Sequence, residues 1–176
     1  IKDTFDKNNL LNPHKIVRPY KSDDRSLMRY KSGYKAEKIS THYDWSSWGQ
    51  FSDAIEMCNN NGACRKLDSG VMCPSYRVTK EEKDLVRGRA NTLRLALSNQ
   101  LPKDSFVSKG MYETMELCVS CKACQRECPM SVDMAKMKSE FLSHYYQKFS
   151  MSIKDNVISN MPKLIWLLKF SNPIIN

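Results

Sequence analysis

Glycine and proline are scarce in this chain. Six glycines and seven prolines make up about 7% of its 176 residues, whereas an average protein contains about 12%. Because these residues supply most tight turns between short strands, their scarcity argues against an all-β sandwich and favours helices. Long apolar runs are also lacking. The longest, residues 164–168, is far shorter than the roughly 20 residues that span a bilayer.

We expect neither a secretory leader nor a disulfide framework. No charged and then apolar segment with a cleavage site follows Ile1, so we expect a cytoplasmic protein. The seven cysteines are about 4% of the chain, below the roughly 8–10% of a disulfide-stabilised scaffold, and an odd number cannot pair fully within one chain. In a reducing compartment, closely spaced cysteines more often bind metal or carry out redox chemistry.

Composition divides the chain into four stretches. Residues 1–18 contain Asn and Pro turn signals around a short apolar piece, and residues 19–50 interleave aromatic side chains with Lys, Arg and Ser, which is typical of an extended linker. Residues 51–149 contain every cysteine and most of the helical signal. Residues 150–176 resemble the start of a connection to a further domain.

Residues 51–149 contain an internal repeat. AIEMC at 54–58 is followed by Cys64 and by the Cys-Pro pair at 73–74, and TMELC at 114–118 is followed by Cys121, Cys124 and the Cys-Pro pair at 128–129. A helix follows each half. The sequence therefore predicts a mainly α fold with two pseudo-symmetric helical halves.

The helices have clear boundaries and apolar stripes. A capping box at Thr79 and Glu82 predicts a helix over roughly 80–98, and Ser131 and Asp133 predict the start of a second that continues to about residue 148. The predicted buried stripes are Val86, Ala90, Leu93 and Leu97 in the first and Met134, Met137, Phe141 and Tyr145 in the second. Further helical segments are expected around 51–58 and 106–118. Gly88 inside a helix costs about 1 kcal/mol relative to Ala, which predicts close approach of another backbone segment, such as the neighbouring helix.

The strongest motif is Cys118-x2-Cys121-x2-Cys124-x3-Cys128-Pro129. This spacing is associated with cubane iron–sulfur clusters, in which three closely spaced cysteines bind three irons and the fourth serves the other cluster. The first cluster should therefore take its fourth ligand from Cys73.

The remaining cysteines, Cys58, Cys64 and Cys128, predict a second site. Its middle position is occupied by Asn61, and a carboxamide is a poor ligand for iron in a thiolate site. Three outcomes stay open for this site: a 4Fe–4S cluster with one ligand that is not cysteine, a three-iron cluster, or an empty remnant.

Zinc is the alternative interpretation of the cysteines. Zinc sites usually combine two C-x2-C or Cys/His pairs in one tetrahedral set, which fits seven cysteines with two Cys-Pro endings poorly. A Rieske centre requires two histidines, but His14, His42 and His144 lie far from the cysteines in sequence.

The chain is basic, with 28 Lys and Arg against 19 Asp and Glu and a net charge of +9. Such a charge with interleaved aromatic residues also suits nucleic acid, but no nucleic-acid-binding motif accompanies it, and we predict no such partner. Six cations lie near the predicted ligands, where they either tune a cluster or simply face solvent: Arg65, Lys66, Arg87, Arg89, Lys122 and Arg126. Residues 164–168 suit contact with a membrane surface or with another domain.

With these motifs, the chain resembles the iron–sulfur segment of FAD-linked oxidases and dehydrogenases of the D-lactate, glycolate and D-2-hydroxyglutarate dehydrogenase type. The resemblance spans roughly residues 43–145 and is carried by EMCNNNGACRK at 56–66, VMCPSYRVT at 71–79, VRGRANTLRLAL at 86–97 and ELCVSCKACQRECPMSVDMAKMK at 116–138. FDKNNLLNPHKIV at 5–17 is similar to the end of the FAD-oxidase C-terminal lobe, although Lys7 and His14 replace the usual Pro and Gly.

The resemblance implies an alpha-helical ferredoxin-like domain within a longer redox chain. An upstream FAD domain would oxidise a 2-hydroxy acid, and the iron–sulfur segment would pass single electrons to a downstream cysteine-rich domain or to a quinone or cytochrome acceptor. No nucleophile–base pair or phosphate loop stands out, so no catalytic residue is predicted. A separate iron–sulfur subunit that docks on a flavoprotein, and a zinc-stabilised binding module, are the alternatives.

Overall fold

The computed structural model describes residues 1–170, with side chains through residue 166. The chain divides into two compact units, residues 1–35 and residues 36 onward, which we describe separately. The first unit contains a short helix, α1 (Lys2–Phe5), and a 3-10 turn, η1 (Arg25–Leu27), and no side chain in it is buried. The Asp6 carboxylate accepts hydrogen bonds from the backbone N–H groups of Leu10 and Leu11, each at 2.9 Å.

The second unit consists of helices and turns, and its described residues contain no strand. Its elements are η2 (Ser46–Trp48), α2 (Phe51–Glu56), η3 (Ala63–Arg65), α3 (Pro74–Thr79), η4 (Glu82–Asp84), α4 (Val86–Leu97), η5 (Ser105–Val107), α5 (Lys109–Glu116), α6 (Ala123–Glu127), α7 (Met134–Lys148) and α8 (Ile153–Phe170). The mainly α fold class is therefore confirmed. A short helix, a cysteine-bearing turn and a long helix occur twice in this order, in the segments that end with α4 and with α7.

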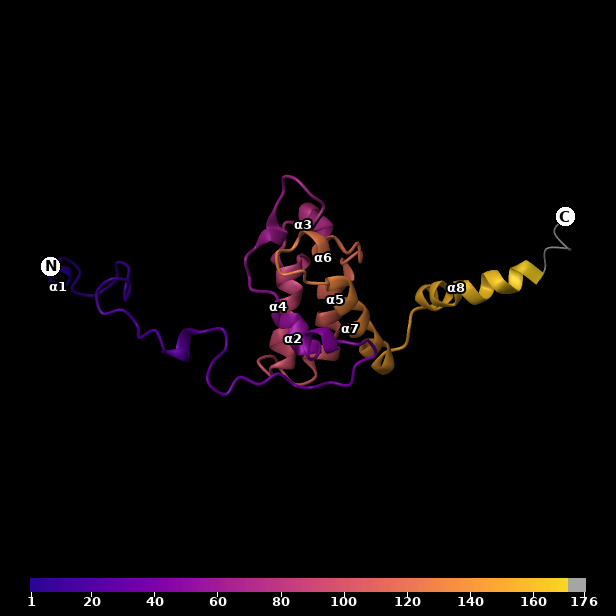
Figure 1. Cartoon of the computed structure of the whole chain (residues 1–176), viewed down its shortest axis with the longest axis horizontal. Helices are drawn as coiled ribbons and strands as arrows, with labels where there is room; N and C mark the ends of the chain where they lie inside the picture. The colour runs from indigo at the N-terminus through magenta and orange to yellow at the C-terminus, as the bar shows by residue number, and fades with distance from the viewer. Residues whose placement is uncertain (171–176) are drawn as a thin grey trace. The chain divides into compact units, whose positions relative to one another are not determined.

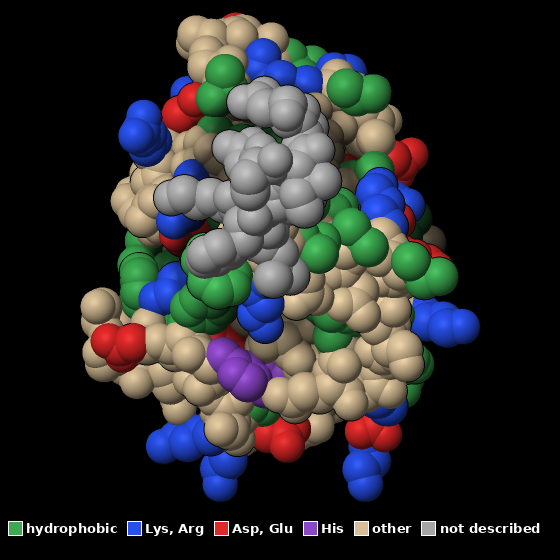
Figure 2. Space-filling view, turned by 90° about the vertical axis from the view of Figure 1, so that its right-hand side faces the viewer, with side chains coloured by type: hydrophobic (Ala, Val, Ile, Leu, Met, Phe, Trp, Pro, Cys, Tyr) green, Lys and Arg blue, Asp and Glu red, His purple; other side chains and the backbone are tan. Residues whose placement is uncertain are grey.

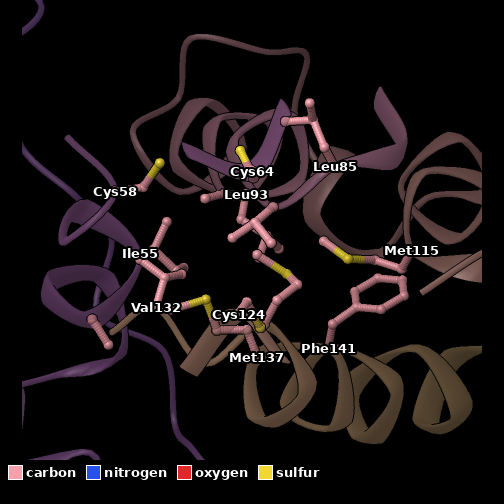
Figure 3. Close-up of a cluster of buried hydrophobic side chains, with 14 of the residues drawn as sticks. Ile55, Cys58, Cys64, Leu85, Leu93, Met115, Cys124, Val132, Met137 and Phe141 are labelled. Atoms are coloured by element: carbon pink, nitrogen blue, oxygen red, sulfur yellow. The ribbon is translucent and has the colours of Figure 1, made fainter. Parts of the chain in front are cut away.

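Helix α4 lies at the centre of the second unit. It contacts α2, α5 and α7, and the four helices lie close together in Figure 1. The predicted stripe of α4 is buried, and so are Met134, Met137 and Phe141 of α7. Figure 3 shows Leu93 of α4 with Met137 and Phe141 of α7 in this core. Burial of each large apolar side chain contributes about 1.5–3 kcal/mol, so this core fixes the ends of the helices that carry the cysteines.

Helix α4 begins later than the sequence pattern predicts. The predicted helix over 80–98 is wrong at its start, because α3 ends at Thr79 and Lys80 adopts a left-handed conformation with φ of 61°. Thr79 Oγ1 accepts a hydrogen bond from the backbone N–H of Glu81 at 3.2 Å, whereas a capping box requires the N–H of Glu82. The turn η4 intervenes before α4 and carries Asp84 into the interior.

Gly88 allows η4 to pack against α4. A Cβ atom on Gly88 would lie 2.0 Å from the carbonyl oxygen of Glu82 and 3.1 Å from Cα of Lys83. Both atoms belong to the backbone and cannot rotate away, so only a residue without Cβ fits here. The predicted close approach is confirmed, but its partner is the turn η4 and not the neighbouring helix.

Glu140 of α7 binds the segment that precedes α2. Its side chain is fully buried, and its carboxylate accepts hydrogen bonds from the backbone N–H groups of His42 at 2.9 Å and Tyr43 at 3.0 Å. The indole N–H of Trp45 donates a further bond at 2.9 Å, and Nε2 of His144 lies 3.1 Å away. Burial raises the pKa of Glu140, but these hydrogen bonds outweigh it and hold the pKa below its usual value.

We expect Glu140→Gln to destabilise the protein by about 2–3 kcal/mol at neutral pH, because an amide NH2 group cannot accept these N–H donors. The pKa of Glu140 in the folded state lies below 4.5, the usual value for a glutamate. The stability that its charge contributes is therefore fully present above about pH 4.5. It is lost as the pH falls through the folded-state pKa. The free energies of unfolding of the two proteins, measured from pH 7 down to pH 3, should therefore converge at the acid end.

Glu113 of α5 provides the matched control, because its side chain is exposed. Glu113→Gln should change the free energy of unfolding by no more than about 0.5 kcal/mol at any pH. If the difference between the Glu140→Gln protein and the unmodified protein were constant across the pH range, the charge of Glu140 would not be the source of the stability.

Helix α8 follows the core and carries the apolar residues near the end of the chain. Within the described residues, no helix meets the length and hydropathy that a membrane span requires. Leu164, Ile165 and Trp166 are exposed, and the side chains of Leu167 and Leu168, which belong to the same predicted contact patch, lie outside the described ones.

Candidate functional site

One pocket collects four cysteines from two separate segments of the chain. It is lined by Cys73 from the first half of the repeat and by Cys118, Cys121 and Cys124 from the second. The rest of its lining includes Met72, Pro74, Val86, Val119, Ala123, Met134 and Ala135. The structure thus brings together the four residues predicted to bind the first cluster, in a largely apolar setting.

Local structure places each of these cysteines at an end of a helix or in a turn. Cys73 is the N-cap of α3, and Pro74 occupies the first helical position, where its missing N–H costs nothing. Cys118 follows the C-cap of α5, and Cys124 lies in α6. Between them, Ser120 and Lys122 have positive φ values of 53° and 59°, which wind the chain tightly around exposed Cys121.

Cys124 of α6 is buried next to the first residue of α7. Burial raises the pKa of its thiol to about 11, while the backbone N–H of Met134, the first residue of α7, donates a hydrogen bond to its sulfur and opposes that rise. An N–H group at a helix N-terminus stabilises negative charge on sulfur. A bound metal replaces the thiol proton, so this position suits a metal-bound thiolate.

Cys58 and Cys64 form a second group. Both are buried, and they lie close enough to influence each other electrostatically. The backbone N–H of Arg87 in the first turn of α4 donates a hydrogen bond to the sulfur of Cys64, while burial raises the pKa of that thiol. Cys64 therefore has the same relation to α4 that Cys124 has to α7. In Figure 3 the side chain of Leu93 lies between the sulfurs of Cys64 and Cys124.

Cys128 lies apart from the first pocket. It is the C-cap of α6, half-buried against the apolar core that includes Cys58 and Cys64, and it does not line the pocket of Cys73. Its placement is compatible with the predicted second site, whose ligands remain a prediction.

The asparagine nearest to the sulfur of Cys58 is not the one that the sequence pattern indicates. Asn61, which stands at the missing ligand position, bonds within its own turn: its Oδ1 accepts from the N–H of Ala63 at 2.8 Å and its Nδ2 donates to Asn59 at 2.6 Å. Asn60 instead places Oδ1 3.9 Å from the sulfur of Cys58. Sequence reasoning did not single out Asn60, although the Asn59-Asn60-Asn61-Gly62 turn marked the region.

Five of the six cations near the predicted ligands reach solvent, and one does not. Arg89 is fully buried, and its Nη1 lies 3.7 Å from the sulfur of Cys73. Arg87 forms a two-point ion pair with Glu82 at 2.6 and 2.8 Å. A further cation that the sequence did not indicate is half-buried Lys138, which donates to the carbonyl oxygen of Cys118 at 2.6 Å. Figure 2 shows Lys and Arg side chains lying singly or in small groups on one face.

The spread of the four cysteines around the pocket is compatible with an iron–sulfur cluster. Within the described residues, no three Cys, His, Asp or Glu side chains converge as ligands of one ion would. A cubane cluster binds each thiolate to a different iron, so its ligands surround a volume and need not converge on a point. Four cysteines around one apolar pocket fit that requirement.

Comparison with known proteins identifies the chemistry of this region. Residues 54–132 match the family model described as the 4Fe-4S dicluster domain. The whole chain is 26% identical to D-2-hydroxyglutarate dehydrogenase of Pantoea ananatis, and 92% of it is 29% identical to the Haemophilus influenzae enzyme and 27% identical to the Escherichia coli enzyme of the same name. The chain spans 19–20% of the length of these curated relatives.

No solved structure matched the chain. The match to the family model includes all seven cysteines and ends before Asp133, so it covers the four cysteines of the pocket, the Cys58–Cys64 group and helix α4. Residues 54–132 thus match the 4Fe-4S dicluster domain family, in a chain that is similar along its length to part of the D-2-hydroxyglutarate dehydrogenases.

Proposed function

We propose that residues 51–149 transfer single electrons within an FAD-dependent 2-hydroxy-acid dehydrogenase. A bound 4Fe–4S cluster accepts and releases one electron at a time, which complements a flavin that receives two electrons from its substrate. The observation that carries this proposal is the pocket lined by Cys73, Cys118, Cys121 and Cys124.

The proposed ligands come from both halves of the repeat, because cysteines of both halves line one pocket. Cys118, Cys121 and Cys124 would hold three irons of one cluster, and Cys73 would supply the fourth thiolate from the other half. Cys58, Cys64 and Cys128 would serve the second site. The backbone N–H groups of Arg87 and Met134 support this arrangement, since each donates to a cysteine sulfur from the first turn of a long helix.

The flavin domain and the substrate are inferred from the relatives. All three relatives named above are D-2-hydroxyglutarate dehydrogenases, and the chain spans only 19–20% of their length. We infer that residues 1–18 end a preceding FAD domain and that residues 150–176 lead to a downstream redox domain or to a quinone or cytochrome acceptor. D-2-hydroxyglutarate is therefore the first 2-hydroxy acid to test as substrate.

Iron and acid-labile sulfide, counted per chain after anaerobic purification, test the proposal. About four of each indicate one cubane cluster, and about seven or eight indicate that the site of Cys58, Cys64 and Cys128 is also loaded. Zinc without sulfide would overturn electron transfer and leave a zinc-stabilised binding module. Reduction of the cluster signal on addition of D-2-hydroxyglutarate to the complete protein would support the link to a flavin.

A further inference from the structure

We propose that the buried pair of Arg89 and Asp84 sets the reduction potential of the cluster held by Cys73, with Arg89 raising that potential and Asp84 lowering it. The inference rests on the proposed function, because it requires that Cys73 binds a cluster. Arg89 and Asp84 are positioning residues in this account: Arg89 acts next to the sulfur of Cys73, Asp84 acts through its ion pair with Arg89, and neither binds iron.

Arg89 is in direct contact with the surroundings of Cys73. The side chain is 0% exposed. Its Nη1 donates to the carbonyl oxygen of Asp84 at 2.7 Å and lies 3.7 Å from the sulfur of Cys73, and its Nη2 donates to the hydroxyl of Ser75 at 3.2 Å. Ser75 Oγ in turn lies 3.4 Å from the same sulfur. The Ser75 hydroxyl donates to the carbonyl oxygen of Asp84 at 2.6 Å, so the guanidinium reaches the ligand sulfur directly, through Nη1.

Asp84 supplies the opposite charge at the same place. Its side chain is 1% exposed, and Oδ1 lies 3.8 Å from Nη2 of Arg89. Neither carboxylate oxygen has a hydrogen-bond partner in the described part of the chain. A carboxylate that accepts no hydrogen bond is costly to bury unless a neighbouring cation compensates its charge. Arg89 provides that compensation, and water does not screen either charge.

The sign of each effect follows from the charge of the cluster. Reduction adds one electron, here supplied by dithionite, and makes the cluster more negative without forming or breaking a covalent bond. A cation and an N–H donor next to a ligand sulfur stabilise the reduced form more than the oxidised form, and an anion does the reverse. A potential that responds in opposite directions to the two residues is not expected from packing alone.

A packing role for Arg89 also exists, and the experiment must separate it from the electrostatic one. Arg89 Nε donates to the carbonyl oxygen of Thr114 at 2.9 Å, so the side chain joins α4 to α5. Truncation of Arg89 would leave Asp84 buried and unpaired, which destabilises proteins strongly. For this reason the conservative variants Arg89→Lys and Asp84→Asn, and the double variant Arg89→Gln/Asp84→Asn, belong in the test.

The experiment is a potentiometric titration of the complete protein, purified anaerobically, in which EPR follows the reduced cluster. We expect Arg89→Gln to shift the potential of one cluster to a more negative value and Asp84→Asn to shift it to a more positive value. The double variant should fall between them, and Arg89→Lys, which keeps the charge, should shift it less than Arg89→Gln. Iron and sulfide contents should match those of the unmodified protein.

Arg94 of the same helix is the matched control. It is also buried, with its Nε and Nη1 atoms lacking hydrogen-bond partners among the described residues, and Arg94→Gln should leave the potential unchanged. Shifts of the same sign in Arg89→Gln and Asp84→Asn, or no shift in either at full cluster content, would overturn this inference alone. If Arg89→Gln does not fold, the direction in which Asp84→Asn shifts the reduction potential decides: a positive shift supports the inference, and a negative shift or none overturns it. An unmodified protein without iron and sulfide would overturn the proposed function as well.

Discussion

The Cys73→Ala protein is expected to lose one complete cluster, about four iron and four sulfide per chain, although Cys73 is 45 residues away from Cys118 in the sequence. The physical reason is the shared pocket, in which Cys73 is the thiolate that the second half of the repeat does not supply. The measurement is the content of iron and sulfide together with the EPR spectrum of the reduced protein. The cluster signal assigned to Cys118, Cys121 and Cys124 should disappear.

Cys128→Ala is the matched control, because Cys128 belongs to the same continuous motif as Cys118, Cys121 and Cys124. If the ligands cross between the halves, Cys128→Ala spares this cluster and affects the site of Cys58 and Cys64. If each cluster instead took its ligands from one half, the two variants would exchange their effects. That exchange, or survival of the signal in Cys73→Ala, would show that the assignment of Cys73 is wrong.

Gly88→Ala should cost about 3 kcal/mol or more of the free energy of unfolding. An added methyl group usually gains about 1 kcal/mol in a helix relative to Gly. Here it would lie 2.0 Å from the carbonyl oxygen of Glu82, and forcing backbone segments apart in a packed core exceeds that gain. Displacement of η4 would also move Asp84 and with it Arg89. Chemical denaturation of the cluster-loaded protein measures the loss.

Gly110 tests whether this effect comes from the contact or from helix propensity. It lies in α5, and the nearest atom to an added Cβ, Oγ of Ser108, is 4.0 Å away. Gly110→Ala should therefore leave the free energy of unfolding unchanged or raise it by up to about 1 kcal/mol. Similar losses in both variants would contradict the role of the contact between η4 and α4.

The apolar periodicity of the sequence predicted the core because it is a local property. Val86, Ala90, Leu93 and Leu97 fall on one face of α4 at helical spacing, and all four are buried. Asp133 was likewise a correct start signal, since its carboxylate accepts a hydrogen bond from the N–H of Lys136 at 3.0 Å. These features depend on residues only a few positions apart.

The capping box at Thr79 failed for the opposite reason. A Ser or Thr three residues before Glu stabilises a helix start when nothing else competes for the chain. Here the chain must turn at Lys80 and again at η4, so that Asp84 can enter the core and Gly88 can pack against the turn. Packing between η4 and α4 outweighed the local preference for a helix start at Thr79. A short sequence window does not show this packing.

The cysteines and charged residues show where sequence alone stops. Spacing identified the iron–sulfur motif at 118–128, because the residues of the motif are neighbours in the chain. The general pattern of two-cluster ferredoxins then suggested a crossed fourth ligand. Only the tertiary structure placed Cys73 in the pocket of that motif and separated Arg89 from the other basic residues by burying it beside the sulfur. The reason is that burial and long-range contact depend on how α3, α4 and α5 pack, and solvent-facing and buried arginines look the same in sequence.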